Sequence, residues 1–331
     1  MISEPDTNKD ACVVPGPVVC IVGPTASGKS SLADALALRL GTDVISVDSM
    51  QVYRGMDIGT AKTPVAERSV ALQMVDVADI SEDYSVARFQ LEARALVDER
   101  LGLGKVPVLC GGTGLYLDAV IDEMDFPSGE THGSSRTKYE VYATERGGQA
   151  LWELLRERDP KSAEAIHPNN QRRVARALEM LDEGVSYADA LGGLKDKRAY
   201  YDARIWGITM GRERLYARIN ARVDLMFEAG LVDEVKGLKE AGYGVDLTAR
   251  QAIGYKEVLD YLDGAISLDE ASELIKQRSR HYAKRQISWL KRDGRVRWLD
   301  YDRLSQDEAL ELVLSDLSAV CGEGSGARAS L

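Results

Sequence analysis

Residues 23–30 carry the pattern GxxxxGK[ST], whose residue types suit the binding of phosphate. An apolar run at 18–22 precedes this pattern, and a helical pattern with leucine at every fourth residue follows it. Successive backbone N–H groups of such a loop surround an anion, and the helix N-terminus adds positive potential. Lys29 would neutralise phosphate oxygens, and the Ser30 hydroxyl would bind Mg²⁺. The predicted phosphate site consists of Gly23, Pro24, Thr25, Ala26, Ser27, Gly28, Lys29 and Ser30.

This loop alone does not identify the ligand, because nucleotide kinases, ATPases and GTPases all use it. An ATPase usually has a second aspartate at the end of an apolar strand, yet the apolar run 106–110 ends in Gly-Gly-Thr. No NKxD segment, which would recognise guanine, follows a predicted strand. The sequence therefore argues against a switch GTPase and disfavours ordinary ATP hydrolysis.

Asp48 is a second candidate for chemistry, because it follows the predicted strand 44–47. Open α/β sheets bind ligands in the crevice beyond the carboxyl ends of their strands, where a carboxylate can act as a general base. Asp48 and Gln51 also fit a capping box at the start of a helix. The local sequence leaves both interpretations open.

The elements that must position these residues alternate between strands and helices. Strands are predicted at 18–22, 44–47, 106–110 and 205–209, and helices at 83–101, 212–241 and 267–291. This alternation predicts an α/β fold: a P-loop NTPase-like core with a mostly parallel sheet flanked by helices.

A change of composition divides the chain. Residues 122–133 are rich in Pro, Gly, Ser and acids, and helical patterns follow at 134–158, 170–183 and 187–191. We therefore expect a small all-helical insertion domain at 122–200. The catalytic core would comprise 17–121 and 201–318, with disordered tails at 1–16 and 319–331.

Composition excludes several classes of protein. The 331 residues include 42 Lys and Arg and 53 Asp and Glu, a formal net charge of -11. No apolar run approaches the roughly 18 residues that a membrane span needs, and the polar N-terminal segment does not resemble a secretory signal. Four cysteines without paired spacing and three distant histidines predict neither a zinc site nor a disulfide framework. We expect a cytoplasmic protein without membrane contact.

Six blocks, in order, resemble the tRNA dimethylallyltransferases, also called tRNA isopentenyltransferases. They are GPTASGKS at 23–30, DSMQVYRGMDIGTAK at 48–62, GGTGLY at 111–116, RRVARALE at 172–179, QAIGYKE at 251–257 and YAKRQISWL at 282–290. The resemblance covers nearly the whole chain. It implies transfer of the dimethylallyl group of dimethylallyl diphosphate to N6 of the adenosine at tRNA position 37, just 3′ of the anticodon. It also implies Mg²⁺ and a P-loop that holds diphosphate instead of a nucleotide, which would account for the missing second aspartate.

The resemblance assigns roles to individual residues. It implies Asp48 as the general base, Arg218 as a diphosphate contact and Thr113 as a contact to the target nucleotide. Arg214, Arg218 and Arg222 recur at every fourth residue and form a basic stripe on the helix at 212–241; for Arg214 we expect an ordinary solvated residue. For the remaining contacts to the tRNA anticodon stem-loop we expect Ser49, Met50, Gln51, Val52, Tyr53, Arg136, Arg172, Arg173, Arg176, Gln251, Gly254, Tyr255, Lys256, Arg278, Lys284 and Arg285, together with Asp48 and Thr113.

A basic segment supports an RNA partner. Residues 276–297 contain nine Lys and Arg and one Asp, a local charge of +8 in an acidic chain. Such cations suit phosphate contacts that position RNA without reading its sequence. Ile275, Tyr282 and Trp289 recur at intervals of seven and predict the buried seam of a helix, not stacked bases.

Two other functions are compatible with parts of the sequence. A small-molecule or nucleoside kinase would use Asp48 to activate a hydroxyl group, and a non-catalytic RNA-binding module would retain a relict P-loop. A kinase would show saturable ATP binding, whereas an RNA module would bind RNA regardless of Lys29. We expect the transferase to act as a monomer without an obligate protein partner.

Overall fold

The computed structural model describes residues 17–82, 84–124, 126, 134–190, 198–242 and 252–325, with backbone alone at 134–137 and 319–325. Six strands form one sheet in the order β3-β2-β4-β1-β5-β6. Every neighbouring pair is parallel, which confirms the predicted α/β fold. The strands are β1 Val18–Val22, β2 Val44–Val47, β3 Leu72–Gln73, β4 Val108–Gly111, β5 Ala203–Thr209 and β6 Arg297–Asp300.

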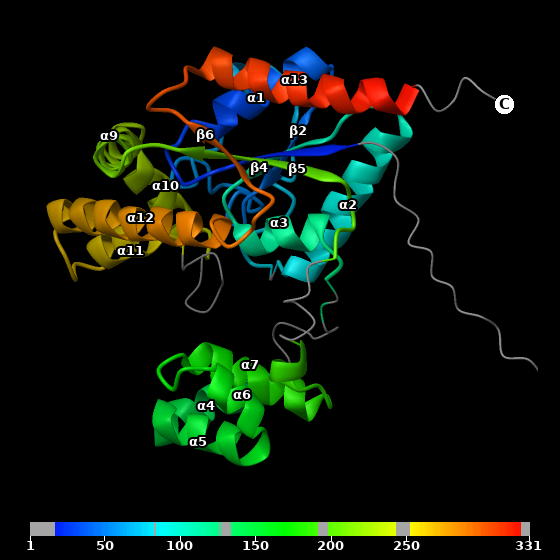
Figure 1. Cartoon of the computed structure of the whole chain (residues 1–331). Coiled ribbons are helices and arrows are strands. Elements are labelled where there is room, and N and C mark those ends of the chain that lie inside the picture. Colours follow the sequence, from blue (N-terminus) through cyan, green and yellow to red (C-terminus); the bar gives the residue numbers. More distant parts are fainter. Residues whose placement is uncertain are drawn as a thin grey trace, which may run out of the picture.

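Helices cover both faces of the sheet (Figure 1). Alternate residues of β1 enter different hydrophobic clusters: Cys20 packs with residues of α2 (Val86–Gly102) and α3 (Gly114–Ile121), and Ile21 with residues of α1 (Lys29–Leu40) and α13 (Gln306–Ser325). A strand buried on both faces must be apolar throughout, which explains the unbroken run at 18–22.

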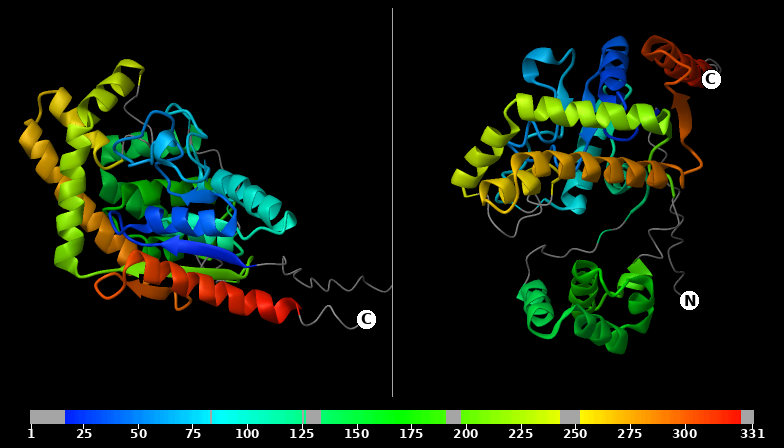
Figure 2. Two further views of the ribbon diagram at one scale, coloured as in Figure 1. Left: turned by 90° about the horizontal axis from the view of Figure 1, so that it is seen from above. Right: turned by 90° about the vertical axis from the view of Figure 1, so that its left-hand side faces the viewer.

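A second group of helices extends the first of these two layers. It comprises α9 Arg212–Glu228, α10 Leu231–Glu240, α11 Tyr255–Leu262 and α12 Leu268–Leu290. The long helices α9 and α12 run side by side (Figure 2), and Leu215, Ile219 and Ala283 are buried between them. This pair brings two basic helices to the edge of the sheet where β1, β2 and β4 end.

Glycine divides two segments that were each predicted as one helix. The predicted helix 212–241 is interrupted at Gly230, which has a φ of 96°, and 134–158 is interrupted at Gly147, with a φ of 86°. Residues with side chains rarely adopt this left-handed conformation, whereas glycine does so readily and commonly ends helices. Both predictions of a single helix were wrong at these positions.

The helices of the predicted insertion pack on one another. They are α4 Ser134–Arg146, α5 Gly148–Arg158, α6 Pro160–Ala165 and α7 Gln171–Asp182, followed by a short helical stretch at 187–190. Leu151, Leu155 and Leu178 belong to a hydrophobic cluster formed within this group. In Figure 1 the group lies apart from the sheet, and a bridge between Asp122 and Ala199 joins the two connecting segments.

Three further details differ from the prediction. The strands β3 and β6 were not predicted, because β3 has two residues and β6 carries charged residues at both ends. The 3-10 helix η1 Val65–Glu67 was also missed. Helix α13 continues to Ser325, past residue 319, where a disordered tail was predicted; its apolar residues Val313 and Leu317 pack beside α1 and carry the helix into that segment. Among the described residues, no helix is long and apolar enough to span a membrane.

Candidate active site

The P-loop lies between β1 and α1, as its sequence predicts. Gly28 has a φ of 96° and Ala26 a φ of 61°, so the loop turns sharply before α1 begins at Lys29. Lys29 Nζ donates a hydrogen bond to the carbonyl oxygen of Pro24 at 3.3 Å. Burial lowers the pKa of Lys29, and the nearby Arg222 lowers it further, while Cys110 and Asp48 act in the opposite direction. A cation held in these surroundings is suited to an anionic ligand.

Asp48 follows β2 at the same edge of the sheet. Its Oδ1 accepts a hydrogen bond from the backbone N–H of Met50 at 2.9 Å, which is an Asx turn. Residues 49–52 form turns in the described structure, so the interpretation of Asp48 as a helix cap was wrong. Gln51 instead accepts a bond from the Ser46 hydroxyl at 2.8 Å and donates to the carbonyl of Thr60 at 3.1 Å.

Thr113 follows β4, the strand between β2 and β1. Its hydroxyl oxygen accepts a hydrogen bond from Ser49 N at 3.2 Å, beside Asp48. Tyr282 of α12 completes this group: burial raises its pKa to about 12, with the Asp48 carboxylate acting in the same direction. The structure therefore brings Asp48 and Thr113 together, with Tyr282 beside them.

The arginines of the basic stripe on α9 lie in two different environments. Arg218 Nε donates to the carbonyl of Ala26 at 2.8 Å, and an Arg222 terminal nitrogen donates to the Thr25 hydroxyl at 3.1 Å. Arg214 instead pairs with Asp302 at 3.0 Å, which agrees with the expected solvated role. Arg222 was not among the predicted site residues, although its spacing of four from Arg218 was a signal. Its buried Nε has no hydrogen-bond partner within the described residues, a state that a bound anion would relieve.

Two cavities meet at these residues. One, of about 250 Å³, contains Asp48 and Tyr282 and has an apolar side; the other, of about 640 Å³, contains Arg218. The apolar side of the first is formed by Met50, Ile219, Val223, Met226, Ile253 and Ile275. Residues that line both are Lys29, Ser30, Ser46, Gln51, Cys110 and Arg222. The arrangement places cations, a carboxylate and an apolar surface around one space.

Gln286 of α12 connects the parts of the site. Its Oε1 accepts a bond from Thr25 N at 2.8 Å, and its Nε2 donates to the carbonyl of Gly112 at 2.9 Å. Sequence reasoning did not identify this residue. Only the three-dimensional approach of α12 to the P-loop and to the turn after β4 reveals its position.

Several predicted RNA contacts occupy other environments. Val52, Tyr53 and Tyr255 have exposed fractions of 0%, 1% and 0%, so direct side-chain contact with RNA was a wrong prediction for them. These side chains pack in the core because the loop after β2 folds back over α10 and α11. Gly254 is buried as well, at the start of α11.

Other predicted RNA contacts are accessible. Ser49, Met50, Gln51 and Arg285 line the cavity of Asp48. Arg176 pairs with Glu179 at 2.7 Å and Arg278 with Glu257. Gln251 and the side chain of Arg136 lie outside the described residues. Exposed residues of the predicted set are Arg172, Arg173, Lys256, Lys284 and Arg285.

The predicted buried seam of α12 was only partly correct. Ile275 is 1% exposed, Tyr282 is half-buried beside the cavity, and Trp289 is 38% exposed with its Nε1 donating to Asp118 at 3.2 Å. A seven-residue repeat drifts by about 20° per repeat around a straight helix, so these three side chains do not share one environment.

One cluster of carboxylates in the described residues could hold a metal ion. The oxygens of Asp118, Asp122 and Asp293 lie within 4.8 Å of one another. Arg295 already contacts this cluster, with bonds to Asp122 at 2.6 and 2.8 Å and to Asp293 at 2.7 Å. None of the four residues lines either cavity.

Comparison with known proteins gives a consistent result. The profile of the IPP transferase family matches residues 51–293, and that of isopentenyl transferase matches 16–73. A tRNA dimethylallyltransferase of Carboxydothermus hydrogenoformans is 44% identical over 303 residues, which cover 90% of this chain and 96% of that protein. One from Geobacillus kaustophilus is 46% identical and covers 86% and 90%, respectively.

Solved structures agree with the sequence relatives. The full-length tRNA isopentenylpyrophosphate transferase of Bacillus halodurans has a TM-score of 0.66 and 44% identity, over 92% of this chain and 98% of that one. A eukaryotic dimethylallyltransferase acting on tRNA has a TM-score of 0.76 and 27% identity, over 92% and 80%. These relatives disfavour the kinase interpretation.

Proposed function

The chain belongs to the IPP transferase family, and we propose that it transfers the dimethylallyl group of dimethylallyl diphosphate to N6 of the tRNA adenosine just 3′ of the anticodon. The observation that carries the proposal is the meeting of the P-loop, two arginines of α9 and the Asp48 carboxylate around connected cavities. The products are N6-dimethylallyladenosine in tRNA and diphosphate.

Cations at the P-loop would stabilise the charge of the leaving diphosphate. When the allylic C–O bond breaks, its electron pair goes to diphosphate, and positive groups aimed at that charge lower the barrier. We assign this role to Lys29, Arg218 and Arg222, each of which contacts the P-loop, and to the backbone N–H groups of that loop. The apolar side of the first cavity, including Ile219 and Val223, suits the five-carbon group.

Asp48 serves the nucleophile. An exocyclic adenine amine is weakly nucleophilic because its lone pair is delocalised, and proton removal by a positioned base is worth about 10²–10⁴-fold. As the N6–C bond forms, the Asp48 carboxylate accepts the proton of N6. The Asx turn with Met50 fixes the carboxylate, and Thr113 and Tyr282 lie beside it to orient the nucleotide.

Mg²⁺ is the proposed cofactor. Ser30 lines both cavities, as does Lys29, and hard oxygen ligands from the Ser30 hydroxyl and diphosphate would suit this ion. When bound, Mg²⁺ would offset the charge of the diphosphate oxygens. The protein's own contribution is to hold the phosphate end in place through the P-loop and α9.

The anticodon stem-loop is the proposed RNA partner. The exposed Arg172 and Arg173 of α7, together with Lys284 and Arg285 of α12, would provide phosphate contacts. We also propose that the protein acts as a monomer. We also propose a cytoplasmic location, which the free, buried Cys20 and Cys110 support.

RNA mass provides the test. Wild type, Asp48→Asn and the control Asp260→Asn, an aspartate that lines neither cavity, would be incubated with Mg²⁺, dimethylallyl diphosphate and an anticodon stem-loop. We expect one dimethylallyl unit on the RNA with wild type and the control, and a rate at least about 10²-fold lower with Asp48→Asn. If the folded wild-type protein leaves the RNA unmodified, the proposal is refuted.

A further inference from the structure

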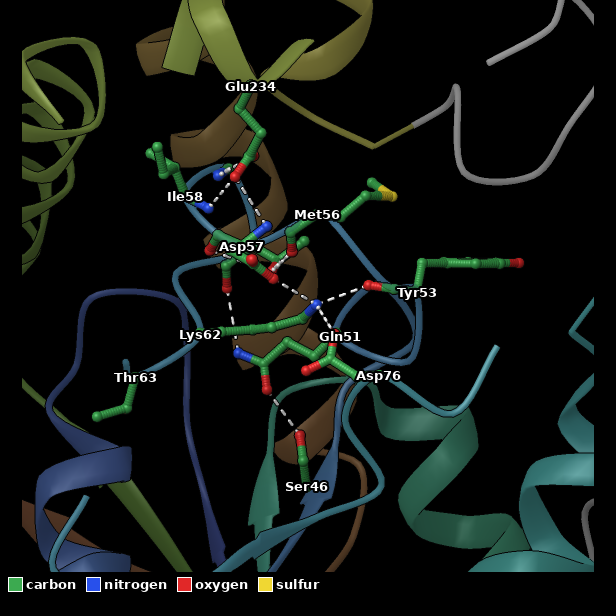
Figure 3. A network of polar contacts seen from close by, with 12 residues as sticks. Ser46, Gln51, Tyr53, Met56, Asp57, Ile58, Lys62, Thr63, Asp76 and Glu234 are labelled. Carbon is green, nitrogen blue, oxygen red and sulfur yellow. Dashed lines mark hydrogen bonds and ion pairs between the residues drawn. The ribbon is translucent and has the colours of Figure 1, made fainter. Parts of the chain in front are cut away.

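A single carboxylate fastens the loop after β2 to helix α10 (Figure 3). Glu234 accepts hydrogen bonds from three consecutive backbone N–H groups, at 3.0 Å from Asp57, 2.8 Å from Ile58 and 3.2 Å from Gly59. The hydroxyl of Tyr255 donates to the same carboxylate at 2.6 Å. Consecutive N–H groups directed at one anion form a strong and directional contact.

Lys62 closes the same loop from the inside. Its side chain is 3% exposed, and Nζ donates to the carbonyl of Tyr53 at 2.6 Å, to Asp57 at 2.8 Å and to Asp76 at 2.6 Å (Figure 3). A buried ammonium group needs such partners to offset its desolvation. The loop is therefore held together by its own contacts, and the bonds to Glu234 fix its position against α10.

The fastened loop forms one wall of the cavity that contains Asp48. Gly59, Thr60 and Ala61 line that cavity, and the Thr60 carbonyl accepts the bond from Gln51, which lines both cavities. Gly59 packs against the ring of Tyr255: an added Cβ would lie 2.4 Å from that ring. The contacts run from Glu234 through the backbone of 57–59 to Thr60 and Gln51.

The helix that carries Glu234 also connects to the phosphate end. Gly230 joins α10 to α9, whose Arg218 and Arg222 contact the P-loop. Glu234 thus links two parts of the site: the loop that lines the cavity of Asp48, and the helix α9, whose arginines contact the P-loop. A reaction between two bound substrates depends on the relative position of these two parts, because a misplacement of about 1 Å lowers the rate by up to about 10²-fold.

We infer that Glu234 is a positioning residue for prenyl transfer: it holds the 57–61 wall in register with α9 without touching either substrate. This inference rests on the proposed function. It predicts a separation of effects, because the P-loop and α9 hold the diphosphate without help from this wall. Loss of the clamp should slow transfer and leave the binding of dimethylallyl diphosphate unchanged.

The test compares Glu234→Gln with Glu240→Gln, an exposed glutamate on the same helix. In single turnovers with saturating RNA and dimethylallyl diphosphate, we expect the rate of Glu234→Gln to fall about tenfold to a hundredfold. Its Kd for dimethylallyl diphosphate should stay within a factor of two of wild type. Tyr255→Phe, which retains the ring against Gly59, should show a smaller loss in the same direction, and Glu240→Gln should match wild type.

Hydrogen exchange supplies a readout that does not depend on activity. The amides of Asp57, Ile58 and Gly59 should exchange faster in Glu234→Gln than in wild type, with the P-loop amides unchanged. A wild-type single-turnover rate in Glu234→Gln, or a lower melting temperature with unaltered kinetic constants, would overturn the inference. If wild type itself leaves the RNA unmodified, the proposed function fails and this positioning role fails with it, whereas a slow Glu240→Gln variant would overturn the inference alone.

Discussion

The two ends of the catalytic space are built in different ways. The phosphate end comes from one stretch of sequence, residues 23–30, set between a buried strand and a helix. The end around Asp48 is assembled from the loop after β2, the turn after β4 and α12, through contacts such as Ser49 with Thr113 and Gln286 with Gly112. Changes far from the P-loop should therefore spare diphosphate binding and impair transfer.

Replacement of Lys29 should have the largest effect, and it tests the phosphate end directly. We expect Lys29→Met to lower transfer by about 10³-fold, because it removes a cation aimed at the departing diphosphate. Calorimetry should also show the loss of dimethylallyl diphosphate binding. Binding of dimethylallyl diphosphate at wild-type affinity would show instead that the backbone of the P-loop is sufficient to hold it.

Lys29→Met should also change how the free energy of unfolding depends on pH. Burial holds the pKa of Lys29 below its ordinary value of 10.5, so the unfolded state binds more protons between the two pKa values. The free energy of unfolding of the ligand-free protein should gain a positive contribution from Lys29 as pH rises through that window. Lys29→Met should remove this contribution and be no less stable than wild type at neutral pH. Chemical denaturation at several pH values measures both effects.

The arginines of α9 provide a matched pair for the next test. Arg222 contacts Thr25 of the P-loop, whereas Arg214, on the same helix, pairs with Asp302 outside both cavities. Arg222→Gln should lower the transfer rate by about 10²-fold, since it removes one preorganised donor to the leaving group. Arg214→Gln should leave the rate within a factor of two. Equal losses in the two variants would assign the effect to general charge on α9, not to contact with the P-loop.

The sequence predicts local features of this site far better than assembled ones. The strand at 18–22, the P-loop and Asp48 lie where they were expected, because each depends on a few neighbouring residues. Arg222 and Gln286 depend instead on how α9 and α12 cross the sheet edge, and no local pattern specifies that. The burial of Tyr53 and Tyr255 was missed for the same reason.

The helical segments show the same limit. The periodicity of apolar residues predicted helices across 134–158 and 212–241. It carried no information about the breaks that Gly147 and Gly230 introduce. At both positions the chain needs a left-handed residue to end one helix and begin another, and glycine meets this need at low cost. Together, these breaks set the directions of α5 and α10, and the second of them delivers Glu234 to the loop after β2.

Replacement of Gln286 tests the end of the site around Asp48, and we expect a moderate effect on the transfer rate. Gln286→Ala removes the bonds to Thr25 N and to the Gly112 carbonyl, and we expect a loss of about tenfold in the single-turnover rate. Gly112→Ala should behave alike, since its new Cβ would lie 2.1 Å from Gln286 Nε2. The control is Gln277→Ala, an exposed position on the same helix. A normal rate in both site variants would mean that α12 does not position the two loops.

The smallest expected effect concerns RNA binding by the helical insertion. Arg172 and Arg173 are exposed on the first turn of α7, and each phosphate contact releases counterions when RNA binds. The double variant Arg172→Gln, Arg173→Gln should therefore reduce the slope of log K against log salt for an anticodon stem-loop by roughly 1.5. Its transfer rate at saturating RNA should equal that of wild type, because neither arginine lines a cavity.

Arg39 and Arg303, two exposed arginines outside the helical insertion, give the matched control. Arg39→Gln, Arg303→Gln changes the net charge by the same amount at positions that line neither cavity. If this control reduces the salt slope as much as the α7 variant, the RNA responds to the total charge of the protein and the insertion makes no specific contact. A change confined to the α7 variant would place RNA phosphates on the insertion. It would also separate a third, purely electrostatic surface from the two ends of the catalytic space.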